Sequence, residues 1–374
     1  MKIAIISEWL QDYAGAERVL EQMLLCYPDA DLFAVVDFLP DDQRGFLRGH
    51  TPRTSFIQRL PFARRIFRQY VGLMPIAVEQ FDLSGYDLVL SNSHAVAKGV
   101  LTGPDTVHVS YVHSPMRYAW DLQHQYLRES GLNRGLRGLY ARYLLARLRR
   151  WDLGTANGVD AFLTNSTYIA RRIRKTYRRE ALVIPPPVDV DRFTPADATT
   201  GTTSGDTYLI AGRHVAYKRV DLVAAAFAAM PQRKLLIVRD GPAHARVRAA
   251  AAGAANITFR PSVPQPELIA LMRQARAFVF AGEEDFGIVL AEALACGTPV
   301  IAFGRGGARD IVTDGTGLFF DQQTPAAIID AVARFETTSY AAETCRAAAQ
   351  HLAPALFRDR LRAAVDAALA KAHT

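Results

Sequence analysis

The sequence has only three cysteines and no long apolar run, and both absences narrow the class of protein. Cys26, Cys296 and Cys345 are odd in number and far apart, which disfavours a disulfide framework or a zinc site. No apolar stretch approaches the ~20 residues of a membrane-spanning helix. The opening residues, MKIAIISEWL, soon carry an acid and are rich in β-branched side chains. We expect a buried β-strand there rather than a signal peptide, and a cytoplasmic protein.

The charge of the chain is strongly positive although its hydrophobic content is ordinary. The formal net charge is +7 and half of the residues are hydrophobic. A basic chain attracts nucleic acid, anionic lipid or phosphorylated substrates, so the charge alone does not choose among these partners. Neither a Ser-His-Asp arrangement nor a metal-ligand spacing is visible, and no metal or other cofactor is expected.

Short apolar strands alternate with helical stretches in both halves of the chain. Runs such as KIAIIS, DLFAVV and YDLVLSN precede a proline-rich segment, VIPPPVDVDRF at 183–193, and TYLIAGR, KLLIVRDG and AFVFAG follow it. This alternation predicts an α/β protein of two doubly wound, parallel-sheet domains that face each other across a cleft. We expect an N-terminal domain at 1–184, a C-terminal domain at 190–352, and a last helix at 355–374 that packs back on the first domain.

Two glutamates flank a strand-to-helix loop in the stretch EEDFGIVLAEALACGTPVIA at 283–302. Gly287 permits close backbone approach to a ligand, and the helix expected from about Ile288 favours a phosphate at its start. A carboxylate beside a phosphate would be repelled, so Glu284 and Glu292 are expected to contact neutral hydroxyls of a sugar and a ribose. The alternative is one capping acid and one solvated acid.

An upstream loop supplies positive charge. In LIAGRHVAYKRVDL, Arg213 and Lys218 flank another strand-to-helix turn. A guanidinium and an ammonium there would clamp a diphosphate and stabilise it as a leaving group without a metal. Taken alone, the loop is equally compatible with two solvated surface bases.

The loop EEDFGIVLAEALACGTPVIAFGRGG, preceded by GRHVAYKRVDL, resembles the retaining glycosyltransferases of family 4, which have the GT-B fold. The resemblance implies that the first glutamate and nearby amides hold the donor sugar, that the second holds the ribose, and that the Arg and Lys hold the diphosphate. The donor-binding residues implied are Gly15, Arg213, Lys218, Glu284, Asp285, Phe286, Gly287, Ile288 and Glu292. His113, Glu284, Lys218 and Arg213 are the implied catalytic set, with a nucleotide sugar as substrate.

The expected first domain carries the other candidates. Gly15 lies where a strand turns into a helix, with Ala14 where the family commonly has a second glycine. His113 follows a strand in VSYVHSPMRYAWD, and the resemblance implies that it lies close to the transferred sugar. Further candidates for contact with the acceptor are His94, Lys98, Arg117 and Ser166, of which Ser166 is also suited to cap the following helix.

Three segments together, SHAVAKGVL, VHSPMRYAWD and EEDFGIV, resemble a subgroup of GDP-mannose-dependent α-mannosyltransferases. That subgroup extends polyprenyl-diphosphate-linked oligosaccharides in exopolysaccharide or O-antigen assembly. The prediction is therefore retaining transfer of mannose from GDP-mannose to a hydroxyl of a lipid-linked oligosaccharide. A UDP-sugar-dependent transferase of the same fold and a nucleotide-sugar epimerase stay open as alternatives.

Two segments mix arginines with aromatic and aliphatic residues, at 54–75 and 133–151. Basic and apolar faces at helical spacing suit an anionic membrane surface, so both are expected to bind peripherally to the inner face of the plasma membrane. Surface helices with snorkelling arginines are the alternative. A nucleic-acid-binding protein would leave Glu284, Gly287 and Glu292 unexplained, so no nucleic-acid partner is expected. The stretch GRGGAR at 304–309 lacks the final glycine of a dinucleotide motif and is not assigned a site.

Overall fold

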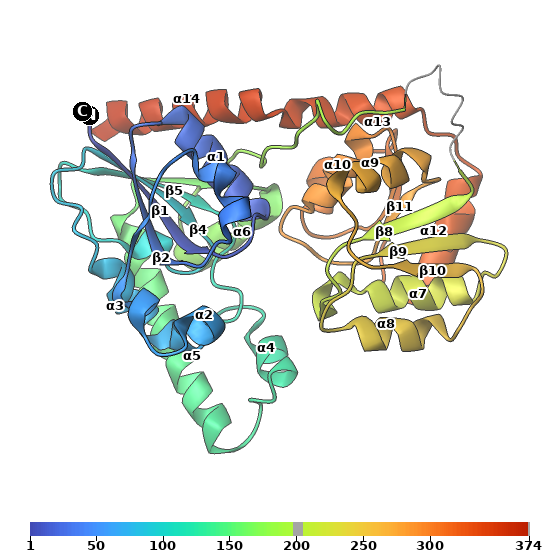
Figure 1. Cartoon of the computed structure of the whole chain (residues 1–374), viewed down its shortest axis with the longest axis horizontal. Coiled ribbons are helices and arrows are strands. Elements are labelled where there is room, and N and C mark those ends of the chain that lie inside the picture. The colour runs from blue at the N-terminus through green and yellow to red at the C-terminus, as the bar shows by residue number, and fades with distance from the viewer. Residues whose placement is uncertain (197–204, 373–374) are drawn as a thin grey trace. The chain divides into compact units, whose positions relative to one another are not determined.

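The computed structural model describes residues 1–196 and 205–372, which form two compact units (Figure 1). Unit 1 is Met1–Pro187 together with the C-terminal helix, and unit 2 is Val188–Pro354. Each unit contains one parallel sheet with helices on both faces, so the predicted fold class is confirmed.

Unit 1 is built on a parallel sheet whose described strands run in the order β3-β2-β1-β4-β5-β6-β7. The strands are β1 (Ile3–Leu10), β2 (Asp31–Asp37), β3 (Arg53–Thr54), β4 (Leu88–Ser93), β5 (Val107–Val112), β6 (Ala161–Thr164) and β7 (Ala181–Val183). Every residue of β4 and β5 is buried, as expected for central strands of a sheet covered on both faces.

The helices of unit 1 cover both faces of this sheet. The α-helices are α1 (Gly15–Cys26), α2 (Ala63–Ile66), α3 (Met74–Glu79), α4 (Gln123–Glu129), α5 (Gly135–Thr155), α6 (Thr167–Tyr177) and α14 (Pro354–Ala372). The 3-10 turns are η1 (Asp41–Leu47), η2 (Phe56–Arg59), η3 (Phe67–Gly72), η4 (Ala97–Gly99) and η5 (Ala156–Gly158).

The helical reading of 54–75 is wrong. This segment is divided among η2, α2, η3 and the start of α3, none of them longer than six residues. Pro61 precedes Phe62, which adopts a left-handed conformation with φ of 56°, and helix geometry is interrupted there. The arginines and aromatic residues of 54–75 therefore do not share one continuous helical face.

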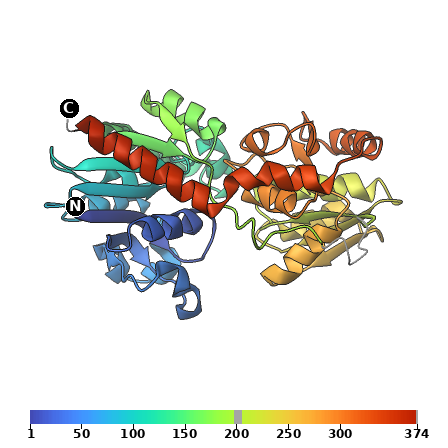
Figure 2. The same ribbon diagram turned by 90° about the horizontal axis from the view of Figure 1, so that it is seen from above.

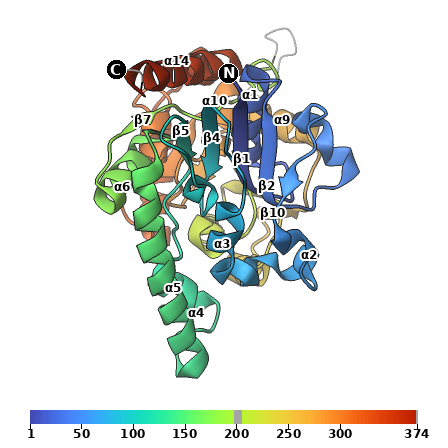
Figure 3. The ribbon, with the colours of Figure 1, turned by 90° about the vertical axis from the view of Figure 1, so that its left-hand side faces the viewer.

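The helix α5 extends well beyond the sheet of unit 1 with α4 beside it, as Figures 1 and 3 show from two directions. At the other side of this unit, α14 lies along the sheet (Figure 2). Phe357, Leu361 and Val365 of α14 are buried in the same hydrophobic cluster as Ile5 of β1 and Tyr111 of β5. The last helix of the chain thus contributes to the core of the unit that contains the first strand.

Unit 2 repeats the architecture, with described strands in the order β10-β9-β8-β11-β12-β13. Its strands are β8 (Thr207–Ala211), β9 (Lys234–Val238), β10 (Ile257–Arg260), β11 (Phe278–Phe280), β12 (Val300–Phe303) and β13 (Gly317–Phe320). Its helices are η7 (Ala216–Lys218), α7 (Val220–Ala228), α8 (His244–Ala251), α9 (Gln265–Gln274), α10 (Ile288–Ala295), α11 (Ala308–Ile311), α12 (Pro325–Glu336), α13 (Ala342–Ala349) and η8 (Gln350–Leu352).

Successive side chains of a strand point to opposite faces of the sheet, and in unit 2 apolar side chains occupy both faces. In β8, Tyr208 and Ile210 enter one hydrophobic cluster, whereas Leu209 and Ala211 enter another on the opposite face. The near-continuous apolar runs seen in the sequence are the consequence of this two-sided burial.

In each sheet the strand order reverses between two neighbouring strands. The reversal lies between β1 and β4 in unit 1 and between β8 and β11 in unit 2. Loops after the strands diverge at such a point and leave room for a ligand at the carboxyl ends. A ligand is therefore expected at the loops that follow β1, β4, β8 and β11.

Candidate functional site

In unit 2, an ion pair joins the two loops that diverge at the strand-order reversal. Lys218, after β8, places its Nζ 3.0 Å from Oε1 of Glu284, after β11, and each side chain is 17% exposed. Burial lowers the pKa of Lys218, but the Glu284 carboxylate outweighs it, so that pKa is raised above its usual value. The ammonium of Lys218 therefore stays charged at neutral pH, and both side chains still reach solvent, as a binding site requires.

Three glycines allow other backbone segments to approach these loops closely. A Cβ on Gly306 would lie 2.3 Å from the Glu284 carbonyl oxygen, and one on Gly307 would lie 2.3 Å from Cα of Phe286. The Gly307 amide donates to the Glu284 carbonyl at 2.9 Å. On the other side, a Cβ on Gly282 would lie 2.9 Å from Cα of Lys218. Gly306 and Gly307 of GRGGAR therefore let this segment pack closely on the loop at 284–287.

The helix α10 begins directly after this loop, at the predicted residue. Gly287 is its N-cap, with φ of 90°, a conformation that only glycine adopts at little cost. Asp285 and Ile288 are partly exposed, and Phe286 is buried against the core below. Glu292 lies within α10 and is 5% exposed. The site thus offers a helix start, a partly exposed carboxylate and an ammonium.

Arg213 lies in the same unit at the end of β8 and its side chain is exposed. Its neighbour His214 is held firmly, because its amide donates to Asp240 and its carbonyl accepts from the Ala243 amide, both at 2.9 Å. The His214 ring also stacks on His244 with 5.2 Å between centroids. This anchoring fixes the backbone from which Arg213 extends.

In unit 1, His113 follows β5 and is oriented by its neighbours. Its Nε2 lies 2.7 Å from Oδ1 of Asn92, whose Nδ2 in turn donates to the carbonyl of Ala16 at 3.0 Å. Asn92 therefore presents oxygen to the ring, so Nε2 of His113 is the donor and Nδ1 is an acceptor. Burial, reinforced by His94, lowers the pKa of His113 to about 3, so its ring is neutral at physiological pH.

His94 follows β4 and pairs with a carboxylate that sequence reasoning missed. Its Nδ1 lies 2.9 Å from Oε2 of Glu8, a fully buried residue of β1. Burial opposes the charge on His94, but Glu8 outweighs it and the pKa of His94 is raised. An acid inside an otherwise apolar N-terminal strand was the available signal.

Gly15 lies at the start of α1, near Asn92, which contacts the adjacent Ala16. A Cβ on Gly15 meets no atom within 4 Å, so packing does not demand glycine there. Glu17 accepts from the Ala14 amide at 3.0 Å and closes the first turn. Glu17 is thus a helix-start residue in this structure.

Two acceptor-side candidates are buried in unit 1. Lys98 is 1% exposed, and its Nζ lies 2.8 Å from Oδ1 of Asp152 and donates to Thr155 Oγ1 at 2.6 Å. Ser166 is fully buried, and its Oγ accepts from the Ile169 amide at the start of α6. Both side chains make these contacts within unit 1. Arg117 and His94 are partly exposed.

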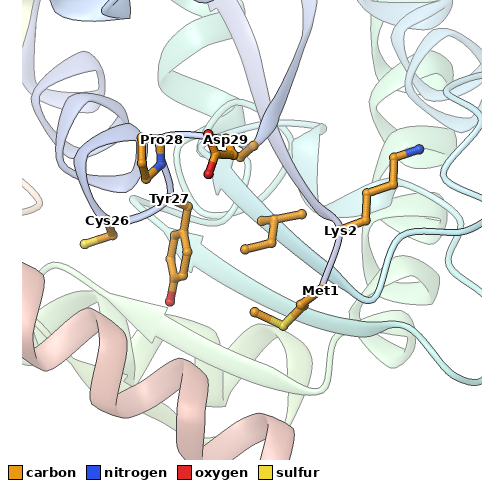
Figure 4. A pocket seen from close by; sticks show the side chains of 8 residues that line it. Met1, Lys2, Cys26, Tyr27, Pro28 and Asp29 are labelled. Atoms are coloured by element: carbon orange, nitrogen blue, oxygen red, sulfur yellow. The ribbon is translucent and has the colours of Figure 1, made fainter.

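A cavity of about 560 Å³ lies elsewhere in unit 1, lined by Met1–Ile3 and Cys26–Ala30 (Figure 4). These residues lie at the amino ends of β1 and β2, whereas His94 and His113 of the same unit follow the carboxyl ends of β4 and β5. Within residues 1–196 and 205–372, no three His, Cys, Asp or Glu side chains are grouped to hold a metal ion. In the same ranges no helix has the length and apolarity needed to cross a bilayer.

Family comparisons assign both units to glycosyltransferases. Residues 13–192 match the profile described as Glycosyltransferase Family 4, and residues 200–352 match Glycosyl transferases group 1. The chain belongs to the glycosyltransferases of the GT-B fold. Neither family description names a donor sugar, so the expected preference for mannose is not tested by these matches.

Curated relatives are similar over part of their length. The D-inositol 3-phosphate glycosyltransferase of Acidothermus cellulolyticus is 31% identical over 219 residues, which are 51% of this chain and 49% of the relative. The enzyme of the same description from Mycobacterium leprae is 30% identical over 217 residues, 52% of this chain and 50% of the relative. The chain thus spans about half the length of the curated relatives it matches.

Solved structures share the fold over nearly the whole chain. Anabaena HepE, solved with UDP and glucose, superposes with a TM-score of 0.68 at 16% identity, covering 98% of this chain and 99% of that one. Sucrose-phosphate synthase from Thermosynechococcus elongatus gives a TM-score of 0.65 at 17% identity, covering 99% and 97%. At these identities the likeness concerns the fold.

Proposed function

We propose that the protein is a retaining glycosyltransferase that moves mannose from GDP-mannose to a hydroxyl of a polyprenyl-diphosphate-linked oligosaccharide in cell-surface polysaccharide synthesis. The observation that carries the proposal is the Lys218–Glu284 pair at the strand-order reversal of unit 2. A diphosphate requires fixed cations, and a sugar requires hydroxyl acceptors beside them. This pair supplies one of each within 3.0 Å.

Unit 2 takes the donor in this proposal. Lys218 and Arg213 hold the diphosphate, and the start of α10 adds amide donors from Gly287 and Ile288. Glu284, with Asp285 and Phe286 in the same loop, holds sugar hydroxyls, and Glu292 holds the ribose. The fixed cations stabilise the departing diphosphate, so the reaction needs neither a metal nor another cofactor.

Unit 1 takes the acceptor and steadies the reacting sugar. The Nε2–H of neutral His113 already donates to Oδ1 of Asn92. Its Nδ1 is therefore the atom that accepts a hydrogen bond from a sugar hydroxyl. At Gly15 the backbone is open to close approach by a ligand. The acceptor hydroxyl attacks from the side of the leaving diphosphate, which takes its proton, and configuration is retained. The glutamates then act as hydroxyl-binding groups, unlike the acid and nucleophile of a glycosidase.

The acceptor also explains the basic character of the chain. A polyprenyl diphosphate is anchored in a bilayer, so an enzyme that uses it works at the inner face of the plasma membrane. The tip of α5 carries exposed Leu136, Leu139 and Tyr140 next to arginines. This surface is suited to an anionic membrane.

A second candidate donor is a UDP-sugar. HepE has this fold and was solved with UDP and with UDP-glucose. The curated relatives are named for D-inositol 3-phosphate, so a phosphorylated cyclitol is a second candidate acceptor. The two donors differ in the base, whereas the diphosphate and sugar contacts proposed above are common to both.

The test is a ligand panel followed by product analysis. Thermal stability is measured in EDTA with GDP, UDP, GDP-mannose, UDP-glucose and UDP-N-acetylglucosamine. A ligand at a hundredfold its dissociation constant adds about 2.7 kcal/mol, a shift of a few degrees. Stabilisation by GDP and GDP-mannose is expected, and a response to uridine nucleotides alone would select the second candidate. A sugar altered without any acceptor would indicate an epimerase.

Site variants then test the assignment. Glu284→Ala is expected to reduce transfer at least a hundredfold, as loss of a group that acts on the reacting sugar does. Glu292→Ala is expected to raise the dissociation constant of the nucleotide about tenfold, the value of one charge-assisted hydrogen bond. Normal kinetics for both variants would contradict the proposed donor site.

A further inference from the structure

Glu8 is a carboxylate buried completely in the core of unit 1. It lies near the carboxyl end of β1, and its Oε1 reaches the turn that follows β4. There it accepts hydrogen bonds from four consecutive amides at 94–97, among them Val96 at 2.6 Å and Ala97 at 3.1 Å. One oxygen thus fixes the whole turn across the strand-order reversal.

The second oxygen of Glu8 forms an ion pair with His94 that lacks hydrogen-bond geometry. The Oε2–Nδ1 distance is 2.9 Å, and the His94 side chain remains 30% exposed. Trp9 meets the His94 ring edge-on at 4.5 Å between centroids, and His113 lies 6.4 Å away. The ring is therefore held from three sides while one part of it faces solvent.

The surroundings of His94 include charges from several elements. Glu8 on β1 and Glu17 on α1 favour its cation, whereas Arg117, after β5, opposes it. His113 has the reverse balance, since burial, His94 and Arg117 all favour its neutral form. Burial of a carboxylate is costly unless a charged or hydrogen-bonding partner compensates for it, and a simple turn could be capped by a neutral side chain. The charge of Glu8 can therefore act on His94 as well as on the turn.

We propose that Glu8 is a positioning residue for the transfer reaction, which holds His94 as an imidazolium beside a neutral His113. The reaction itself is the proposed function of the preceding subsection. The two imidazoles then have separate tasks. His94 supplies a cation for an anionic group such as a phosphate, and His113 supplies a hydrogen-bond acceptor for a hydroxyl. Glu8 does not touch the substrate and acts through His94 and the turn at 94–97.

The experiment is a titration of His94 in the full-length protein with ¹³C-labelled histidine, assigned by loss of its signal in His94→Gln. In Glu8→Gln the shape of the side chain is kept and its charge is lost. The pKa of His94 is expected to fall by at least one unit, and kcat/KM at neutral pH is expected to fall at least tenfold. The affinity for nucleotide, measured by calorimetry, is expected to stay the same because unit 2 is unchanged.

Glu17→Gln is the matched control, since it removes a neighbouring buried carboxylate that does not contact His94. It is expected to shift the pKa of His94 much less than Glu8→Gln does. His94→Gln provides a second route if Glu8→Gln does not fold, because Glu8 keeps its amide partners in that variant. The pH profile of kcat/KM in His94→Gln is expected to lack the limb that follows the His94 titration.

An unchanged His94 pKa in folded Glu8→Gln would overturn the proposal, as would an unchanged pH profile in His94→Gln. The titration needs no substrate, so its result is independent of whether the proposed donor and acceptor are right. Absence of transfer by the wild type from GDP-mannose, UDP-glucose and UDP-N-acetylglucosamine would instead count against the proposed function.

Discussion

At the scale of single residues, Lys218 is the cation on which the proposed diphosphate site depends most. Its ammonium pairs with Glu284 and is proposed to hold a diphosphate. Lys218→Met is expected to weaken GDP or UDP binding about 10- to 100-fold, since hydrogen bonds to charged groups contribute about 1.5–3 kcal/mol. Binding of the corresponding nucleoside should change little. Calorimetry with the diphosphate and the nucleoside measures the difference.

Lys234→Met is a suitable control for this substitution. Lys234 belongs to the same unit, is 63% exposed and pairs with Asp206 at the surface. Its loss should leave nucleotide affinity unchanged. Equal weakening of diphosphate and nucleoside by Lys218→Met would mean that the site had been distorted, and would contradict a direct phosphate contact.

Gly307 gives a second prediction at this scale. A Cβ there would lie 2.3 Å from Cα of Phe286, so the loop at 284–287 has to move. Gly307→Ala is expected to lower the free energy of unfolding by about 1–3 kcal/mol, as overpacking does, and to weaken nucleotide binding. Chemical denaturation and calorimetry measure the two effects.

Gly15→Ala is the comparison for Gly307→Ala, because its Cβ meets no atom within 4 Å. Its stability should match that of the wild type. Wild-type stability and nucleotide affinity in Gly307→Ala would show that the loop does not depend on the close approach of this glycine.

The burial of His108 leads to a prediction of how the free energy of unfolding changes with pH. Burial lowers its pKa to about 4, below the ~6.5 of an unfolded histidine. The unfolded chain therefore binds a proton between pH 6.5 and 4 that the folded chain does not. Stability is lost as pH falls through this window, at up to about 1.4 kcal/mol per pH unit.

The measurement compares the wild type with His108→Gln by urea unfolding at pH 7.5 and pH 5. The loss of stability on acidification should be about 2 kcal/mol smaller in the variant, which follows from about 1.5 pH units below the unfolded pKa. His113, lowered to about 3, acts in the same direction and is present in both proteins. Equal losses in both proteins would mean that His108 is protonated in the fold.

The contrast between residues that the sequence predicted and those it did not has a physical basis. Lys218 and Glu284 were expected because charged residues in loops after buried strands stand out. Glu8 was missed because it sits within a strand, where a single acid gives no indication of its partner. The burial of Lys98 could not be read from the chain, since Asp152 is distant in sequence.

At the scale of elements, α5 is the feature with an unusual surface. Leu136, Leu139, Tyr140 and Tyr143 are 85%, 65%, 66% and 56% exposed, on a helix that extends from unit 1 (Figure 3). Replacing Leu136, Leu139 and Tyr140 with serine should reduce binding to anionic vesicles at least tenfold, because each buried apolar side chain contributes about 1.5–3 kcal/mol. Vesicle sedimentation measures this.

A double variant with serine at Leu101 and Leu182 serves as control. These leucines are 62% and 57% exposed and lie outside α5. Vesicle binding should be retained in the control and should weaken with salt if arginines contribute. Wild-type binding by the α5 variant would remove this helix from the proposed membrane surface.

The elements themselves were predictable where the apolar pattern was long. The strands β1, β4 and β5 and the helices α1 and α6 correspond to the runs seen in the sequence. The segment 54–75 was not predicted correctly, because a repeated mixture of arginines and aromatics resembles helical spacing even where Pro61 and Gly72 interrupt it. The two-residue strand β3 was too short to give any pattern.

At the scale of the whole molecule, each sheet is bridged at its strand-order reversal by one cation and one carboxylate. Lys218 and Glu284 do this in unit 2 at 3.0 Å, and His94 and Glu8 do it in unit 1 at 2.9 Å. The alternation of strands and helices predicts where such a point lies only once the strand order is known. The structure supplied that order, and with it the partner of each charge.

The C-terminal helix gives the last prediction, because it belongs to the unit that contains the N-terminus. Phe357 of α14 is 2% exposed, and its ring lies 5.8 Å from that of Tyr111 on β5. Phe357→Ala should lower the stability of unit 1 by about 3–5 kcal/mol, the usual cost of removing a buried phenylalanine. Unit 2 should be unaffected, since Phe357 has its contacts in the cluster of unit 1.

Hydrogen exchange read by mass spectrometry separates the two units in one experiment. In Phe357→Ala, peptides from β1, β4 and β5 should exchange faster, whereas peptides from β8 and β11 should keep wild-type rates. Leu356→Ala is the neighbouring control, since Leu356 is 41% exposed on the same helix. Faster exchange throughout both units would show that the two sheets unfold together, whereas wild-type rates in unit 1 would mean that α14 contributes little to its core.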